Sequence, residues 1–308
     1  VDNDKSTAEN TAQSLAVPAF YTNYEEMLEK EKPDIVHNCT PTGMHYPINR
    51  GILEKGIHLY CEKPLTLTRE QSKELCVLAR KKGVAAGINF NYRNNIMVHE
   101  MRERVREGHA GKVLSVYGEY LQDWLLYKTD YDWRMDPALG GESRAVADIG
   151  SHLFDMLQFV LGERIVAVYA KLLTVHPVRI KPDHQKTFSS DNGKAGTEVP
   201  IHSEDIAFIM LRFESGCCGL LNLNQVCAGK KNGMSLTISG SKNALEWHQE
   251  RPDHLWVGHR ESGNEDIYAD ARYLGTDAKS YATLPGGHPA GWTDAFRNGI
   301  MAFYESIR

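Results

Sequence analysis

Three short apolar runs separated by helical patterns constrain the fold of the first ninety residues most strongly. The apolar runs occupy residues 34–40, 57–61 and 84–90, and the helical patterns occupy residues 6–15, 23–32, 45–55 and 69–82. Thr68 and Gln71 form a capping-box signature before the last of these helices, and Gly83 ends it. Strands that alternate with helices of this length indicate a parallel sheet with helical crossovers. The region is therefore predicted to be a doubly wound α/β domain.

The pattern changes after Gly108, where strand follows strand. Strands are expected over residues 112–121, 165–176, 206–213, 219–226, 234–239, 244–249 and 254–259, with helices near 149–161 and 292–307. Residues 234–239 alternate between polar and apolar side chains, as a sheet with one exposed face requires. The polar segment 178–201 is interpreted as a mobile loop or an insertion at a sheet edge. We predict an α/β domain over residues 1–94 and an α+β domain with a large, mostly antiparallel open sheet over 95–308.

Composition excludes several classes of function. The chain has 308 residues, 35 Lys and Arg against 40 Asp and Glu, and a net charge of −5, which does not favour binding to nucleic acid or an anionic membrane. No apolar stretch approaches the roughly 20 residues that cross a bilayer. The six cysteines have no metal-ligand spacing, which predicts no metal site and no disulfide framework. Reduced thiols in a cytoplasmic protein are the simplest interpretation.

Polar residues follow each predicted strand of the first domain, where open α/β sheets bind their ligands. Thr40, Pro41 and His45 follow the first strand, Glu62-Lys63-Pro64 the second, and the segment from Asn89 to Arg93 the third. Because proline stiffens the backbone, the Lys63 ammonium is expected to project into a crevice. A solvated lysine in a turn fits this tripeptide equally well.

A second cluster of polar residues lies in the second domain. Gly140 and Gly141 allow a close approach of the backbone to a ligand, and Asp148 and His152 follow, four residues apart at the start of a helix. Asp155 continues the same helix face. A carboxylate beside an imidazole suits proton transfer near neutral pH. The alternative is structural: Asp148 caps the helix and His152 is a packed interface histidine.

Taken together, these motifs resemble the Gfo/Idh/MocA oxidoreductase family, the group of glucose–fructose oxidoreductase and inositol dehydrogenase. The resemblance rests on Cys61-Glu62-Lys63-Pro64 and on Asp148-x-x-x-His152-x-x-Asp155 some eighty residues later, and it extends over nearly the whole chain. Residues 17–19 are similar to the family's third strand, and residues 24–28 to its next helix. The family implies a Rossmann domain followed by a domain with a large antiparallel sheet, which binds substrate and forms oligomers.

The resemblance also implies roles for individual residues. Lys63 would polarise the reacting oxygen, His152 would act as general base, and Asp148 would position the substrate or tune the other two. Further cofactor-binding positions are Thr40, Pro41, His45, Glu62, Pro64, Asn89, Arg93, Trp133 and Arg134. The pair Trp133-Arg134 would close over the nicotinamide, although a surface pair is an alternative. Asp2 fits the acidic position that binds the adenosine ribose, which favours NAD over NADP, unless it is simply a chance aspartate at the terminus.

The sequence suggests a class of substrate without naming one. Trp124, Trp133 and His288, with neighbouring polar groups, resemble the sugar- and inositol-oxidising branches of the family and suit a polyhydroxylated ring; each of the three could equally be ordinary packing. The leading hypothesis is an NAD(P)-dependent dehydrogenase acting on a secondary alcohol of a sugar, anhydrosugar or inositol. The alternatives are an NAD-dependent glycosidase on the same fold and a non-catalytic sugar- or dinucleotide-sensing module. A homodimer or homotetramer through the open sheet is expected.

The chain begins at Val1-Asp2 without an apolar first strand. No Gly-x-Gly-x-x-Gly motif precedes the first helix, so about 30–40 residues of a complete βαβ unit are expected to be missing at this end. Relatives also usually continue past a final helix like that of residues 292–307. The chain is therefore expected to keep the catalytic side chains but to bind NAD weakly or not at all.

Overall fold

The computed structural model describes residues 1–182 and 196–308. The chain divides into two compact units, Val1–Ile88 and Asn89–Arg308. The division therefore falls six residues before the boundary expected after residue 94. Each unit has its own hydrophobic core, and the two are described separately.

The first unit is built on a three-stranded parallel sheet. The strands β1 (Ile35–Asn38), β2 (His58–Cys61) and β3 (Ala86–Ile88) lie in the order β1-β2-β3. The helices are α1 (Lys5–Ser14), α2 (Tyr24–Glu31), α3 (Thr42–Glu54) and α4 (Arg69–Lys82). The parallel α/β fold predicted from the sequence is confirmed.

Local sequence signals explain most of these boundaries. The Thr68 hydroxyl accepts a hydrogen bond from the backbone N–H of Gln71 at 3.3 Å, and Gly83 ends α4 with a φ of +67°. Helix α3 begins at Thr42, three residues before its predicted start, because Pro41 occupies the N-cap position. The strand expected over residues 17–19 is wrong: this exposed segment lies outside any strand, and its central Pro18 has no N–H to donate.

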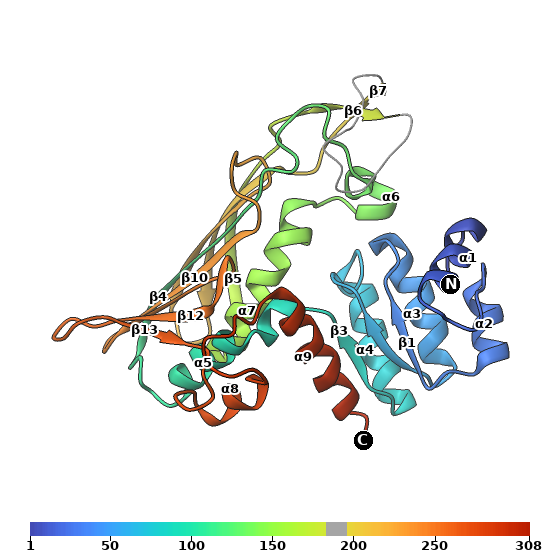
Figure 1. Cartoon of the computed structure of the whole chain (residues 1–308). Coiled ribbons are helices and arrows are strands. Elements are labelled where there is room, and N and C mark those ends of the chain that lie inside the picture. The colour runs from blue at the N-terminus through green and yellow to red at the C-terminus, as the bar shows by residue number, and fades with distance from the viewer. Residues whose placement is uncertain (183–195) are drawn as a thin grey trace. The chain divides into compact units, whose positions relative to one another are not determined.

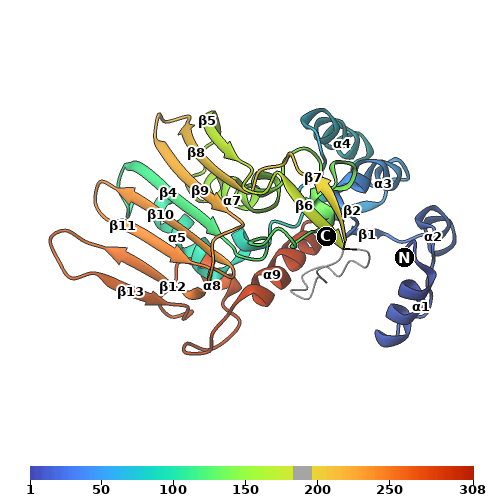
Figure 2. The ribbon, with the colours of Figure 1, turned by 90° about the horizontal axis from the view of Figure 1, so that it is seen from above.

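The second unit contains an eight-stranded sheet. Its strands are β4 (Val113–Leu121), β5 (Ile165–Leu173), β8 (Ile206–Phe213), β9 (Cys218–Asn224), β10 (Gly233–Gly240), β11 (Ala244–His248), β12 (Arg251–Gly258) and β13 (Glu265–Tyr268). They follow the order β13-β12-β11-β10-β4-β9-β8-β5 across the sheet (Figure 2). Every neighbouring pair is antiparallel except β4 and β9. The predicted large, mostly antiparallel sheet is confirmed.

Helices cover one face of this sheet (Figure 1). Met101 of α5 (Ile96–Arg106) and Leu153 of α7 (Ser151–Leu161) pack with Leu221 and Leu236 of the sheet in one buried core. The second unit also contains the short helices η1 (Asn91–Asn94), η2 (Trp133–Met135), α6 (Pro137–Gly140) and α8 (Thr276–Tyr281). The longer helix α9 (Trp292–Glu305) lies near the carboxyl end of the chain. One π-helical turn, η3 (Val146–Gly150), leads directly into α7.

The described ends of the segment 178–201 are strands. Strands β6 (Val178–Pro182) and β7 (Gly196–Pro200) pair as an antiparallel ladder, so these ends are strands and not loop. The part of the loop prediction that falls on residues 183–195 lies outside the described residues. Arg179 of β6 is completely buried, which ties this ladder to the second unit. None of the helices in the described part of the chain is long and apolar enough to cross a membrane.

Candidate active-site residues

In the first unit, His45 links the two polar segments that follow β1 and β2. The buried His45 ring lies with Nδ1 2.8 Å from the Pro64 carbonyl oxygen and Nε2 2.7 Å from the Thr40 carbonyl oxygen. The Thr40 hydroxyl donates to Asn38 Oδ1 at 2.8 Å, so the end of β1 holds Thr40 as well. His45 therefore has a structural role in shaping this edge of the sheet.

Lys63 lies in the segment that leaves β2 at the carboxyl edge of the parallel sheet. The backbone N–H of Glu62 donates to the Asn38 carbonyl at 2.9 Å, and the backbone N–H of Lys63 lies 3.3 Å from Glu62 Oε2. The preceding Cys61 is completely buried, and this burial raises the pKa of its thiol to about 12. Lys63 thus leaves a strand whose last residue is fixed in the core, while Lys63 itself is only partly buried.

The residues proposed to bind NAD in this unit fit a dinucleotide chemically. The carboxylates of Glu62 and Asp2 suit ribose hydroxyls, and Thr40 adds a hydroxyl at the edge where parallel sheets bind nucleotides. Asp2 Oδ1 accepts the backbone N–H of Asp4 at 2.9 Å, and the Asp2 N–H donates to the Tyr21 carbonyl at 3.1 Å. Asp2 is therefore fixed ahead of α1, although it does not end a strand here.

In the second unit, His152 is held inside a cage of aromatic rings. Its side chain is buried, and the ring makes edge-to-face contacts with Tyr92 and Phe90 at centroid distances of 4.7 and 5.8 Å. The Tyr120 ring centroid lies 6.4 Å from that of His152. The Tyr120 hydroxyl is hydrogen-bonded to the Tyr92 hydroxyl at 3.0 Å and donates to Asn232 Oδ1 at 2.6 Å. Burial raises the pKa of Tyr120 well above its usual value, so its hydroxyl stays protonated. The cage fixes the plane of the imidazole ring.

Asp148 is anchored from two sides within the π-helical turn that precedes α7. Gln225 Nε2 donates to Asp148 Oδ2 at 3.0 Å, and Arg134 Nε lies 3.4 Å from Asp148 Oδ1. The sequence predicted an ordinary helix start here, whereas the structure has a π turn, a distortion that often occurs at functional sites. Asp148 is therefore part of a side-chain network and more than a helix cap.

The structure brings Trp124, Trp133 and Arg134 together beside Asp148. The Arg134 guanidinium carbon lies 4.5 Å from the centroid of Trp133 and 6.0 Å from that of Trp124. Arg134 also pairs with the buried Asp132 at 3.0 Å. His288, in contrast, lies in an exposed turn with its Nδ1 3.0 Å from the Pro285 carbonyl oxygen. Three of these four residues thus share one cluster with Asp148.

Arg93 and Asn89, both predicted to bind the cofactor, lie within the packed second unit. The Arg93 guanidinium forms a bidentate pair with Asp155 and lies 4.8 Å over the ring of Phe159. Burial raises the pKa of the Asp155 carboxyl to about 6, although Arg93 acts in the opposite direction. Asn89 is buried at the start of the second unit. Arg93 and Asp155 therefore act first as a structural ion pair.

Gly140 also has a structural reason to be glycine. A Cβ atom at this position would lie 2.3 Å from the Arg134 carbonyl oxygen, so only a residue without a side chain fits. Gly141 has a φ of +86°, a conformation that favours glycine. The sequence assigned this pair to close approach by a ligand, whereas Gly140 packs against the backbone that carries Arg134.

Sequence reasoning named Arg134 but missed Gln225, the other partner of Asp148, and the buried residues Arg144 and Asp205. Gln225 follows β9 without any motif around it, and Asp205 precedes β8. Arg144 lies inside the Gly140–His152 segment but was assigned no role. A charged residue at the start of an apolar strand, as Asp205 is, was the only available signal. Within residues 1–182 and 196–308, no group of three or more His, Cys, Asp or Glu residues is placed to hold a metal ion.

The fold and these side chains define a class of protein, a two-domain oxidoreductase with a dinucleotide-binding domain. The model of the oxidoreductase family with an NAD-binding Rossmann fold matches residues 1–90, and the model of the GFO/IDH/MocA C-terminal domain matches residues 98–246. The chain belongs to the GFO/IDH/MocA oxidoreductase family. The matched model describes an NAD-binding Rossmann fold, so the predicted family, oxidoreductase class and NAD cofactor are confirmed at this level.

Several known proteins are similar to this chain. A levoglucosan dehydrogenase of Pseudarthrobacter phenanthrenivorans is 32% identical over 74% of the chain, which spans 59% of that enzyme's length. A levoglucosan dehydrogenase structure with NADH and levoglucosan has a TM-score of 0.86 at 25% identity, covering 99% of this chain and 79% of that one. An inositol dehydrogenase homologue from Azotobacter vinelandii with NAD+ shares the fold, with a TM-score of 0.85 at 24% identity and coverage of 100% and 80%.

Proposed function

We propose that this protein is an NAD-dependent dehydrogenase that oxidises a secondary alcohol of a neutral sugar, anhydrosugar or inositol. The observation that carries the proposal is the joint presence, in a chain of this family, of Lys63 after β2 and of a caged His152 four residues after an anchored Asp148. The names of the levoglucosan and inositol dehydrogenase relatives support the class of substrate.

When bound, NAD+ supplies the acceptor for the hydride that leaves the alcohol carbon. The Lys63 ammonium donates a hydrogen bond to the reacting oxygen and stabilises negative charge that develops there. A nitrogen of the His152 ring takes the hydroxyl proton as the carbonyl forms. The fixed ring plane of His152 keeps that nitrogen in one direction, and the Asp148 carboxylate stabilises the positive charge that the proton brings.

The cluster of Trp124, Trp133 and Arg134 supports a ring-shaped polyol as substrate. Tryptophan rings offer apolar surface for the C–H face of a sugar, and Arg134 with Asp132 and Asp148 offers polar groups beside it. Two carboxylates against one guanidinium leave a negative balance in the cluster. This balance favours a neutral polyol over a phosphorylated one. In this proposal His288 also binds the substrate, from an exposed position outside any helix or strand.

Substitution of Lys63 tests the catalytic assignment. Lys63→Met removes the ammonium but keeps an unbranched side chain, so kcat is expected to fall by about 100-fold or more. Lys73→Met, on the exposed face of α4, is the matched control and should retain full activity. NADH absorbance with a panel of polyols and sugars, followed on the full-length protein, gives the rates. Wild-type turnover in the Lys63→Met variant would contradict the role of Lys63.

The same assay separates the other two activities considered for this fold. An NAD-dependent glycosidase would release glycosidic products without net NADH. A sensing module would bind NAD or a sugar without turnover of any substrate in the panel. Either outcome would replace the dehydrogenase proposal.

We also propose that the open face of the large sheet joins copies of this chain as a homodimer or homotetramer. Tyr117, Leu220, Met210 and Tyr169 lie in register across β4, β9, β8 and β5, with exposures of 41%, 44%, 57% and 72%. A contiguous apolar strip of this kind favours association. Met210→Glu should lower the mass measured by light scattering, whereas Val77→Glu, an exposed position on α4, should not. A monomeric wild type at micromolar concentration would refute the proposal.

Cytoplasmic location and a preference for NAD over NADP complete the proposal. All six cysteines are free thiols, which suits a reducing compartment. The Asp2 carboxylate would repel the 2′-phosphate of NADP. Comparison of kcat/KM for the two cofactors in wild type and Asp2→Ser tests this preference, which the substitution should weaken.

A further inference from the structure

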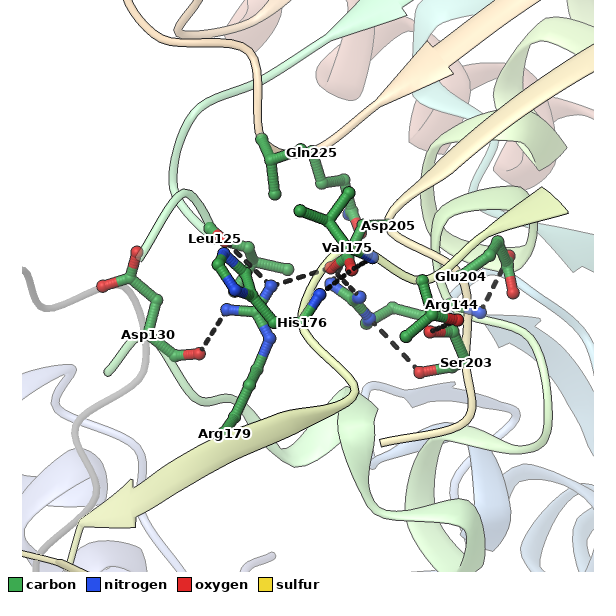
Figure 3. A network of polar contacts seen from close by, with 12 residues as sticks. Leu125, Asp130, Arg144, Val175, His176, Arg179, Ser203, Glu204, Asp205 and Gln225 are labelled. Carbon is green, nitrogen blue, oxygen red and sulfur yellow. Dashed lines mark hydrogen bonds and ion pairs between the residues drawn. The ribbon is translucent and has the colours of Figure 1, made fainter. Parts of the chain in front are cut away.

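A network of buried polar side chains lies in the second unit and includes Arg144, Asp205 and Gln225 (Figure 3). Asp148 is connected to this network through Gln225. Gln225 is completely buried. Its Nε2 donates to Asp148 Oδ2 at 3.0 Å, and its Oε1 accepts from Arg144 Nη1 at 3.3 Å. Its backbone N–H donates to the Asp205 carbonyl at 3.0 Å, and its carbonyl accepts from the Leu125 N–H at 3.3 Å. Both the backbone and the side chain of Gln225 are therefore fixed.

Arg144 determines which way the Gln225 amide points. A guanidinium can only donate hydrogen bonds, so the oxygen of the amide must face Arg144 and the NH2 group must face Asp148. Arg144 cannot turn away, because its side chain is fully buried, its Nη2 pairs with Asp205 and its Nε lies 3.4 Å from Ser203 Oγ. The amide is thus held as a donor toward the carboxylate.

Asp205 keeps this arrangement charged and rigid. Its Oδ1 accepts from Arg144 and from Arg179, the latter at 2.7 Å, and its Oδ2 accepts the backbone N–H groups of Val175 and His176. Burial alone would raise the pKa of Asp205, but the two guanidiniums outweigh it and the pKa is lowered. Asp205 therefore stays ionised at neutral pH and keeps Arg144 in place.

We propose that Gln225 is a positioning residue for Asp148, and that the buried Arg144–Asp205–Arg179 group fixes its amide so that it donates to the carboxylate. Oδ2 of Asp148 is then held by an uncharged donor, while Oδ1 faces Arg134. The carboxylate therefore keeps one orientation beside the substrate. This inference rests on the proposed dehydrogenase function, because it assigns Gln225 to the same site.

Two substitutions distinguish positioning from a purely structural role. Gln225→Glu keeps an acceptor for Arg144 but replaces the donor toward Asp148 with a second carboxylate. Gln225→Leu removes both hydrogen bonds. If Gln225 only satisfied Arg144, the glutamate variant would behave as wild type and only the leucine variant would fail. Positioning of Asp148 instead requires both variants to lose activity.

Gln158 provides the matched control in the same unit. Its Oε1 accepts the Ile165 N–H at 3.2 Å and its Nε2 donates to the Phe154 carbonyl at 3.3 Å, so it also uses both ends of its amide. Gln158→Glu makes the same chemical change away from Asp148. Its activity and its pH profile should match those of wild type.

For Gln225→Glu we expect kcat to fall about tenfold or more, with the KM for NAD unchanged, because a hydrogen bond to a charged group is replaced by repulsion. The acid limb of the pH–kcat profile should move to higher pH, since a second carboxylate makes the pair hold a proton more tightly. The thermal midpoint should fall less than in Gln225→Leu, because Arg144 keeps its partner in the glutamate variant. Wild-type kcat and an unshifted acid limb would overturn the inference.

A measurement without turnover separates this inference from the proposed function. Carbon-detected NMR of protein labelled at aspartate follows the titration of Asp148, whose signal is assigned with Asp148→Asn. Its midpoint should rise in Gln225→Glu and stay unchanged in Gln158→Glu. If the wild type oxidises no polyol, the proposed function fails, and this titration still tests whether Gln225 controls the carboxylate. An unchanged midpoint in Gln225→Glu would refute the inference by itself.

Discussion

The sharpest stability prediction concerns Asp205, which lies between two buried guanidiniums. The side chains of Asp205, Arg144 and Arg179 are all fully inaccessible to solvent. Asp205→Asn keeps the shape of the side chain and removes its charge. In the wild type, Asp205 Oδ1 accepts hydrogen bonds from the two guanidiniums, and Oδ2 accepts them from the N–H groups of Val175 and His176. The new NH2 group must therefore face donors on either side.

The expected loss follows from this geometry. Breaking a buried ion pair by neutralising one partner costs about 3–5 kcal/mol, because the other charge is left buried without compensation. Here two cations lose their shared anion, although the remaining carbonyl oxygen still accepts hydrogen bonds. We therefore expect the free energy of unfolding to fall by about 3 kcal/mol or more. Domains of this kind have only about 5–15 kcal/mol in total, so the effect is large.

Urea unfolding followed by tryptophan fluorescence measures this loss in the correct unit. All five tryptophans lie in the second unit, so the signal reports its unfolding alone. Glu214→Gln, which removes an exposed pair with Arg164, is the control and should leave the midpoint unchanged. Because the pKa of Asp205 is lowered, its stabilisation is present at neutral pH and is lost as the pH falls below 3.8. A loss under about 1 kcal/mol at neutral pH would refute the reasoning.

Two further predictions follow from other positions in the second unit. Burial raises the pKa of Asp155 from 3.8 to about 6, so the unfolded chain ionises first as the pH rises. The wild type should therefore lose up to about 3 kcal/mol of stability between pH 4 and 6, and Asp155→Asn should show no such loss in urea unfolding across this range. Gly140→Ala places a Cβ atom 2.3 Å from the Arg134 carbonyl oxygen, so the backbone must shift and disturb the contact between Arg134 and Asp148. Steady-state kinetics should show a higher KM for the polyol than in wild type; a wild-type KM for the polyol would contradict this.

Elements with local signals were predictable from the sequence. Strand β8 matches its predicted range of 206–213 because these residues form an almost continuous apolar run between Asp205 and Glu214. The bounds of helix α4 were predicted correctly because Thr68 and Gly83 cap its two ends and both signals are local in sequence. Helix α5 had no such signal. Its buried Glu100 and Glu103 interrupt the apolar pattern, and they are satisfied by the N–H groups of residues 275–278, more than 170 positions away.

In the candidate site, too, residues with local sequence signals were predictable and their distant partners were not. The motifs point to Lys63, Asp148 and His152 through short spacings within each segment. The partners that orient them come from distant parts of the chain: Gln225 lies 77 positions from Asp148, and Asp205 lies 61 positions from Arg144. No periodicity links such residues, because hydrogen bonds between side chains impose no spacing along the sequence. These contacts become visible only in the folded unit.

Arg144 shows why a motif can contain more than its reactive groups. It lies four residues before Asp148, and its backbone carbonyl accepts the N–H of Asp148 at 2.7 Å. Its guanidinium reaches the same carboxylate by a second route, through the Gln225 amide. A displacement of Arg144 would therefore move both the backbone and the hydrogen-bond donor of Asp148. The segment from Gly140 to His152 works as one unit because the residue that orients the carboxylate and the residue that carries it belong to the same turn.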